Sequence, residues 1–122
     1  MKAKSRVYTV SEITLEIKSV LETRFDLIWI TGEVSNFSAP TSGHYYFTLK
    51  DDAAQIRSVM FRGQNRQLKF RPEDGMELTG LGRLSVYEPR GTYQMIFEYL
   101  GPRGLGALQK AFEQLKAALA AE

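Results

Sequence analysis

The 122-residue sequence contains no cysteine, a single histidine and only four prolines. The absence of cysteine excludes disulfides, thiol catalysis and cysteine-ligated zinc fingers. With His44 as the one imidazole, any metal site would have to be built from carboxylates alone, so we expect no metal and no cofactor. No apolar run approaches the ~18 residues of a membrane-spanning helix. These absences leave an ordinary globular domain as the starting expectation.

The charge is nearly balanced, with 16 Lys and Arg against 14 Asp and Glu and a formal net charge of +2. A hydrophobic share of 43% with 25% charged residues is normal globular usage and argues against disorder. The length is typical of one domain. The total charge by itself does not indicate a nucleic-acid partner.

The N-terminal residues 1–6 are basic, but they do not lead into a secretory signal. Glu12 and Glu16 interrupt the following segment, and no apolar core of the required length appears. We therefore expect a cytoplasmic protein.

A helix is predicted to begin after Thr9, because Thr9 and Glu12 have the spacing of a capping box. Apolar residues then recur at helical spacing on one stripe as far as about Arg24. The members of this stripe are Val10, Ile13, Ile17, Val20 and Leu21. Residues 1–24 are thus an N-terminal arm and helix.

Five later segments alternate apolar and polar residues with the period of two that is typical of strands. They cover residues 27–35, 44–50, 55–61, 76–87 and 92–100, with a short helical turn expected within 63–70. In the fourth segment Gly80 and Gly82 share the inward face, where glycine allows a barrel strand to bend sharply. Gly101 and Pro102 are expected to break the sheet, which places a barrel at residues 25–102.

The predicted fold is mainly β with flanking helices, a five-stranded OB-fold barrel. The basis is five strands, read as antiparallel, with a helical connection between the third and the fourth, as in a partly open Greek-key barrel. A PH-like barrel would need seven strands, and an SH3-like barrel lacks the helical connection, so both alternatives fit less well.

Residues 103–122 are expected to form an amphipathic C-terminal helix that continues into a longer protein. No stop signal follows its last turn, although a natural terminal helix that frays is the rival interpretation. Its apolar positions Leu108, Phe112, Leu115 and Leu119 offer a route to self-association if they are exposed.

The distribution of charge is more informative than its sum. Residues 53–72 carry five basic residues and no acidic one, whereas acids outnumber bases by fourteen to eleven elsewhere. The alternation places one set of side chains together on the outward face of the second and third strands: Tyr46, Thr48, Lys50, Arg57 and Phe61. Aromatic rings beside cations on an open sheet face are typical of proteins that bind single-stranded nucleic acid, because rings stack on bases and cations hold phosphates.

Each of these residues also has a structural interpretation. Tyr46 and Phe61 could pack against the first helix or a neighbouring domain. Trp29 faces outward by parity but is as often covered by a helix as by a ligand. Phe37 is either a stacking residue or a plug for the barrel mouth. His44 is expected to be structural or phosphate-facing rather than a metal ligand.

No catalytic constellation is apparent. Asp51–Asp52 and Glu73–Asp74 are paired carboxylates, but each pair occurs where a turn favours Asp, and no third ligand is spaced to complete a metal site. The glycines between 101 and 106 lack the Lys-Ser/Thr ending of a phosphate loop. No Ser-His-acid arrangement is present.

Four segments are nevertheless specific: residues 29–37 (WITGEVSNF), 42–51 (SGHYYFTLKD), 59–62 (VMFR) and 86–91 (VYEPRG). In order and spacing they closely resemble the N-terminal domain of the exonuclease VII large subunit. The resemblance covers nearly the whole chain, including the approach to the final helix at 104–108.

The resemblance implies a single-stranded DNA-binding OB-fold that precedes a catalytic region and a long helical region. In that family the helical region recruits several copies of a small subunit, and the holoenzyme degrades single-stranded DNA from either end in the cytoplasm without requiring a divalent metal. This segment would then be the substrate-binding module, its catalytic residues and small-subunit contacts lying beyond Glu122.

Our site hypothesis assigns two roles. Phosphates are expected to contact Lys50, Arg57, Arg62, Arg66 and Arg90, and bases to stack on Tyr46, Phe61 and either Phe37 or Trp29, with His44 nearby. The alternatives are a protein-interaction module that docks a catalytic domain or another copy, and an RNA-binding barrel.

Overall fold

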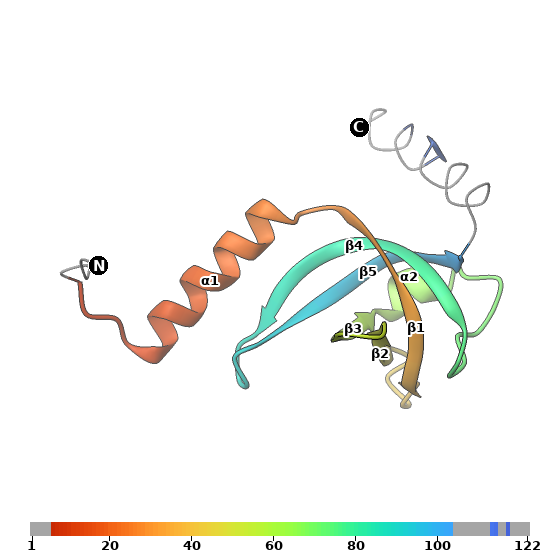
Figure 1. Ribbon diagram of the computed structural model, residues 1–122, viewed down its shortest axis with the longest axis horizontal. Helices are drawn as coiled ribbons and strands as arrows, with labels where there is room; N and C mark the ends of the chain where they lie inside the picture. The colour runs from red at the N-terminus through yellow and green to blue at the C-terminus, as the bar shows by residue number, and fades with distance from the viewer. Residues whose placement is uncertain (1–5, 104–112, 115–116, 118–122) are drawn as a thin grey trace.

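The computed structural model describes residues 6–103, 113–114 and 117. Its elements are α1 (Val10–Arg24), β1 (Ile28–Ser38), β2 (Tyr45–Lys50), β3 (Gln55–Met60), α2 (Arg62–Asn65), β4 (Glu77–Tyr87) and β5 (Thr92–Pro102), shown in Figure 1. The predicted C-terminal stripe at Leu108, Phe112, Leu115 and Leu119 lies outside the described residues.

The five strands form a closed barrel in the order β1-β2-β3-β5-β4, which confirms the OB-fold. Two details of the prediction were wrong. The barrel is closed rather than partly open, and β3 and β5 run parallel, with Arg57 paired to Gln94 and Val59 to Ile96. The parallel pair joins strands that are far apart in sequence, so it leaves no mark in the local alternation.

The barrel interior is filled by one apolar cluster. Its buried members are Val34, Phe47, Leu49, Met60, Leu78, Met95, Phe97 and Leu100. The rings of Phe47 and Phe97 stack with their centroids 5.7 Å apart. Val34, Phe47, Leu49 and Leu78 have the inward parity expected from the sequence. Met95 and Phe97 alternate along β5, whereas Leu100 has the opposite parity because the pairing of β4 with β5 shifts register between Leu81 and Gly82.

The glycine-rich strand β4 curves over the barrel, as Figure 1 shows. Its pairing with β5 shifts register between Leu81 and Gly82. A Cβ atom on Gly80 would lie 2.5 Å from the ring of Phe97, so glycine leaves the space that this core ring occupies. The expected bend at the two inward glycines is therefore confirmed.

Two strand ends differ from the prediction. β1 continues to Ser38, and Asn36 adopts a left-handed φ of 54° where the pairing with β2 shifts between Ser35 and Ser38. Phe37 consequently belongs to a strand and not to a loop. β5 continues through Gly101, which pairs with Thr79, so the sheet does not end there as expected.

Helix α1 has the predicted capping box. The hydroxyl of Thr9 accepts a hydrogen bond from the Glu12 amide, and the Glu12 carboxylate accepts one from the Thr9 amide. The helix is tied to the barrel by polar contacts: Ser85 Oγ donates to Glu22 Oε2 at 2.7 Å, and Lys18 Nζ lies 2.6 Å from Glu88 Oε1. The hydrogen bond from Lys18 to Glu88 raises the pKa of Lys18.

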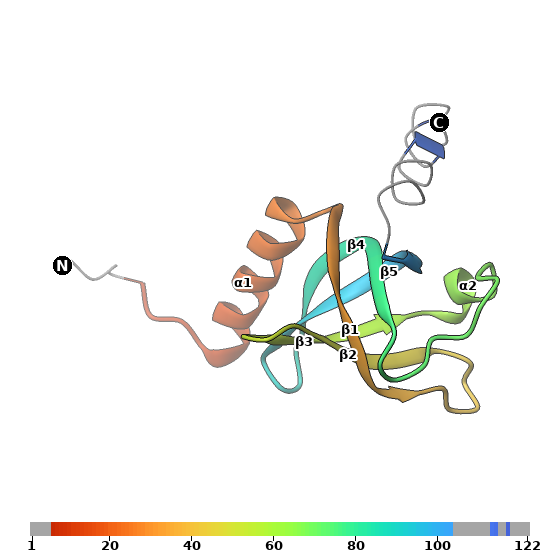
Figure 2. The ribbon, with the colours of Figure 1, turned by 45° about the vertical axis from the view of Figure 1, so that its right-hand side comes forward.

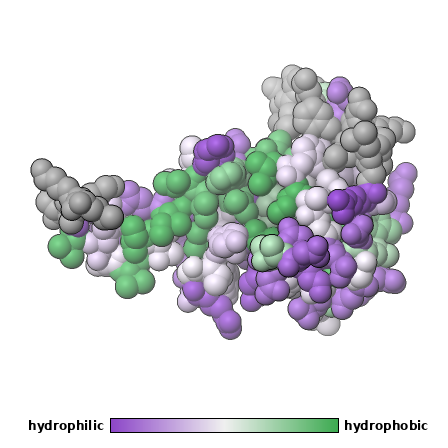
Figure 3. All heavy atoms as spheres, in the orientation of Figure 1, coloured by the Kyte–Doolittle hydropathy of each residue, from purple (hydrophilic) through white to green (hydrophobic). Residues whose placement is uncertain are grey.

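No residue of α1 is buried. Its apolar residues remain on the surface, with exposed fractions of 82% for Val10, 48% for Ile17 and 60% for Val20. Figure 3 shows this hydrophobic surface along α1, while hydrophilic residues gather over the far end of the barrel. None of the helices in the described part of the chain is long and apolar enough to span a membrane.

Helix α2 and the loop between β1 and β2 lie together at the end of the barrel away from α1, as Figure 2 shows. At this end Phe37, Leu68, Phe70 and Met76 pack against the apolar cluster. These apolar side chains therefore fill the end of the barrel that lies beside α2.

Candidate nucleic-acid interface

The outer face of β2 and β3 is built from cross-strand pairs. The register pairs Lys50 with Gln55, Thr48 with Arg57, and Tyr46 with Val59. The β2 members Tyr46, Thr48 and Lys50 face outward because the alternate residues of β2, Phe47 and Leu49, are buried in the barrel, whereas Val59 is itself only 3% exposed. The parallel contact with β5 extends the same face, since Gln94 lies beside Arg57.

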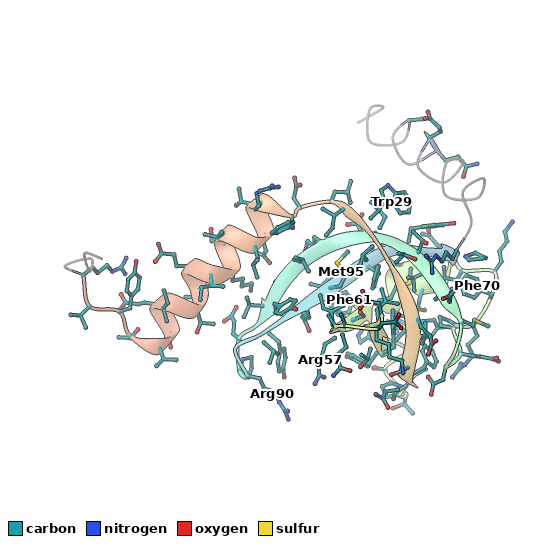
Figure 4. All side chains as sticks on the ribbon, in the orientation of Figure 1. Trp29, Arg57, Phe61, Phe70, Arg90 and Met95 are labelled. Carbon is teal, nitrogen blue, oxygen red and sulfur yellow. The ribbon has the colours of Figure 1, made fainter. Side chains whose placement is uncertain are left out.

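The predicted arginines lie on β3, on α2 and on the β4–β5 hairpin. Arg57, Arg62, Arg66 and Arg90 are exposed and form no ion pair with any described residue. Figure 4 shows Arg57 and Arg90 projecting from the same side of the barrel. Four guanidinium groups are thus available to an anionic ligand.

Lys50 differs from the arginines because its Nζ lies 3.7 Å from the Glu33 carboxylate. Both side chains are largely solvent-exposed, and such surface pairs contribute only about 0–1 kcal/mol. A phosphate could displace Glu33 at little cost, although Lys50 begins with a partner and the four arginines do not.

Three rings form an aromatic cluster on this face: His44, Tyr46 and Phe61. The His44 ring lies edge-on to Phe61, with centroids 5.2 Å apart, and edge-on to Tyr46 at 6.4 Å. Tyr46 and Phe61 remain 40% and 38% exposed. Helix α1 contacts β4, so it does not take the role of a cover for these two rings.

The structure does not bring Trp29 into this group. Trp29 pairs with Leu81 on the outside of β1 and β4, and its ring lies edge-on to Tyr99 with a centroid distance of 6.0 Å. Figure 4 shows Trp29 on the opposite side of the β4 arch from Arg57. Its outward parity was predicted correctly, but a closed barrel has outward faces on every side.

Two roles were predicted for Phe37, and its position in the structure is that of a residue that fills the barrel end. Its ring packs against Tyr45, at a centroid distance of 5.1 Å, and against Phe47 at 6.5 Å. The guanidinium of Arg71 lies 5.3 Å above the same ring, and the Phe37 amide donates to Asp74 Oδ1. Arg71, one of the five basic residues between positions 53 and 72, therefore contacts the Phe37 ring.

Sequence reasoning missed two exposed tyrosines on the hairpin between β4 and β5. Tyr87 and Tyr93 are 46% and 55% exposed, and they flank the turn that carries Arg90. Tyr93 has the parity of the core residue Met95 but stands at an open barrel end, beside a hollow of about 280 Å³. The sequence did contain a signal for these rings, because each tyrosine is three residues away from Arg90.

Sequence reasoning also missed Asn65, because it lies in a polar segment without an apolar periodicity that would indicate a buried position. This side chain is only 6% exposed, and its amide donates to the carbonyl oxygens of Gly43 and Met60. It therefore connects the β1–β2 loop to the basic connection after β3.

The carboxylate pair at 51–52 has the turn role expected from the sequence. Asp51 Oδ1 accepts hydrogen bonds from the amides of Ala53 and Ala54, and these bonds lower the pKa of Asp51. Within the described ranges no group of three or more His, Asp or Glu side chains is placed to hold a metal ion.

Comparison with known proteins identifies relatives of this chain. The chain is 59% identical over 120 residues to the exodeoxyribonuclease 7 large subunit of Geobacter sulfurreducens, which confirms the resemblance found in the sequence. The alignment covers 98% of this chain and 27% of the relative, so the chain spans about a quarter of the relative's length.

Two solved structures share the fold at low sequence identity. A replication protein A heterotrimer bound to single-stranded DNA matches with a TM-score of 0.52 at 16% identity, covering 78% of this chain and 70% of that one. The asparaginyl-tRNA synthetase of Pyrococcus horikoshii matches with a TM-score of 0.53 at 13% identity, covering 72% and 21%. A family model described as an OB-fold nucleic acid binding domain matches residues 8–100, and the chain belongs to this family.

Proposed function

We propose that this chain binds single-stranded DNA and serves as the substrate-binding domain of an exodeoxyribonuclease VII large subunit. The observation that carries the proposal is the outer face of β2 and β3, where Tyr46 and Phe61 are exposed. Arg57 of β3, Arg62 and Arg66 of the following α2 segment and Arg90 of the β4–β5 hairpin are exposed as well, and they have no ion-pair partner among the described residues. The high identity to exodeoxyribonuclease 7 large subunits favours DNA over RNA as the nucleic acid that is bound.

The chemistry of the face suits a single strand of any sequence. Bases that are not paired can stack on Tyr46 and Phe61, each stacked base contributing roughly 1–3 kcal/mol. The guanidinium groups of Arg57 and Arg62 attract the phosphates between those bases without reading sequence. Arg66 and Arg90 extend this attraction toward α2 and toward the β4–β5 hairpin.

We assign hydrolysis of the DNA to the part of the full-length protein outside this chain. Asp51 has a turn role and Gly80 a packing role, and the relatives are several times longer than this segment. The full-length protein would act in the cytoplasm on single-stranded DNA, yielding oligonucleotides, and would bind its small subunit through those other regions.

The test is a titration of a fluorescently labelled oligonucleotide into the domain at two salt concentrations. Replacing Arg57 and Arg62 together by Ala should weaken binding. It should also reduce the slope of log K against log salt by roughly 1.4, because each lost phosphate contact removes about 0.7 on a single strand.

A matched control removes the same charge at the other end of the molecule, through Arg6→Ala with Arg24→Ala. Arg6 pairs with Glu12, and Arg24 lies at the end of α1, so this variant should keep the native slope. Equal binding by the Arg57/Arg62 variant and the native domain would refute the assignment of the face.

The competing functions separate in the same assay. An RNA oligonucleotide of equal length that competes as well as DNA would favour an RNA-binding barrel. Light scattering that detects a dimer indifferent to DNA would favour a protein-interaction module, for which the exposed apolar stripe of α1 is the structural argument.

A further inference from the structure

The loop between β1 and β2, residues 39–44, is fastened to α2 by two side chains. His44 Nδ1 accepts a hydrogen bond from the backbone amide of Arg62 at 3.0 Å. Asn65 Nδ2 donates to the carbonyl oxygen of Gly43 at 2.8 Å and to that of Met60 at 3.1 Å. We call His44 and Asn65, with these three hydrogen bonds, the loop clamp.

The His44 bond satisfies a group that α2 cannot satisfy itself. Arg62 is the first residue of α2, and the first amides of a helix have no partner within it. The preceding residue, Phe61, makes no side-chain cap because it has no acceptor atom. The neutral imidazole of His44 supplies the acceptor from across the loop and carries its own proton on Nε2.

The Asn65 bonds are buried. Asn65 is 6% exposed, and a buried amide left without hydrogen-bond partners destabilises the fold. Its side chain donates hydrogen bonds both to the loop carbonyl of Gly43 and to Met60 at the end of β3. A change in the loop position would therefore leave this buried amide without one of its partners. The loop therefore has one favoured position.

The loop backbone also rests directly on Arg62. Gly43 has a φ of 86°, and a Cβ atom there would lie 2.9 Å from the Cδ atom of the Arg62 side chain. The loop backbone thus lies against the aliphatic part of the arginine that we assign to a phosphate. The same His44 ring contacts Tyr46 and Phe61, the two rings assigned to bases.

We infer that His44 and Asn65 are positioning residues for single-stranded DNA: the loop clamp holds the aromatic cluster and Arg62 in the binding arrangement before the strand arrives. This inference rests on the proposed function. A surface ordered in advance does not spend interaction energy on ordering its loop and side chains upon binding, so it binds more tightly.

The test compares two replacements of the same residue. His44→Asn keeps a hydrogen-bond acceptor near the position of Nδ1 and removes the ring, whereas His44→Phe keeps a ring and removes the acceptor. If the clamp matters, His44→Phe should weaken oligonucleotide binding by roughly fivefold, the equivalent of one net hydrogen bond. His44→Asn should bind more tightly than His44→Phe. The reverse order would overturn the inference.

Asn65→Ala provides an independent arm because Asn65 is buried and does not itself face the strand. It should weaken binding to a similar degree without changing the salt slope, since no phosphate contact is removed. Circular dichroism establishes that each variant is folded at the temperature of the titration. A folded Asn65→Ala domain that binds like the native domain would contradict the clamp.

Amide hydrogen exchange distinguishes positioning from a general loss of stability. In the native domain the amides of Gly43 and Arg62 should exchange slowly without DNA, because both donate hydrogen bonds in the free protein. In His44→Phe and Asn65→Ala these amides should exchange faster in the free domain and regain protection on the oligonucleotide. Unchanged protection in the free variants would overturn the inference.

The two proposals fail separately. If the Arg57/Arg62 variant binds the oligonucleotide like the native domain, the assignment of the binding face is wrong. If that variant binds weakly but His44→Phe and Asn65→Ala bind like the native domain, only the loop clamp is wrong.

Discussion

Gly82 illustrates how a single missing side chain allows the barrel to close. A Cβ atom at this position would lie 2.1 Å from the carbonyl oxygen of Ile96 and 2.9 Å from Cα of Phe97. Both are backbone atoms of β5, so they cannot move aside without shifting the strand. The register shift between β4 and β5 occurs at the same place.

We therefore expect Gly82→Ala to lower the free energy of unfolding by about 3 kcal/mol, the upper part of the usual range for overpacking. Urea denaturation followed by circular dichroism measures it. Gly63→Ala is the matched control, because nothing lies within 4 Å of a Cβ there and alanine is favoured in a helix such as α2. A loss below 1 kcal/mol for Gly82→Ala would show that β5 yields easily.

At the scale of elements, α1 depends on local interactions more than the strands do. It buries no residue. Side-chain hydrogen bonds join Glu22 to Ser85 of β4 and Lys18 to Glu88 in the turn after β4. The capping box therefore matters for its first turn. The hydrogen bond from the Thr9 amide, followed by contacts with Arg6 and the Thr9 side chain, lowers the pKa of Glu12.

Thr9→Ala should destabilise the start of α1 by about 1 kcal/mol, because the Glu12 amide loses its acceptor. The measurement is amide exchange in residues 10–13. Thr9→Ser keeps the hydroxyl and should exchange like the native domain. Since the pKa of Glu12 is lowered, its contribution is present above the ordinary carboxyl value of 4.5 and is lost in stronger acid.

At the scale of the whole molecule, two different surfaces occupy opposite ends. The apolar stripe of α1 lies at one end, and the loop clamp and α2 lie at the other, with the basic face of β2 and β3 between the two ends of the barrel. The net charge of +2 hides this arrangement because acids elsewhere offset the local bases. A nearly neutral domain with one basic face should bind DNA weakly and with a limited dependence on salt.

The expected limit can be stated from the proposed contacts. Lys50, Arg57, Arg62, Arg66 and Arg90 are five cations, and a single strand loses about 0.7 in slope for each neutralised phosphate. The plot of log K against log salt should therefore be no steeper than about −3.5. Fluorescence anisotropy with a labelled oligonucleotide measures this slope. A markedly steeper slope would mean that cations outside the proposed face also contact DNA.

Much of the fold and part of the site could be predicted from local patterns. The capping box at Thr9, the inward face of β1, β2 and β4, and the bend at Gly80 and Gly82 are consequences of neighbouring residues, and all are present in the structure. The outward set with Tyr46 and Arg57 follows from the same alternation. How these residues act on DNA stays a prediction.

The sequence by itself determined the approximate extent of the five strands, which side of most strands enters the core, and where charge of one sign accumulates. Only the tertiary structure decided which outward sides meet. Closure of the barrel through parallel β3 and β5 brings Gln94 beside Arg57 and leaves Trp29 on another side, while the left-handed residue Asn36 turns Phe37 toward the core. Alternation specifies a face locally, but contacts between distant segments, such as the hydrogen bond from the Arg62 amide to His44, depend on how the chain closes on itself.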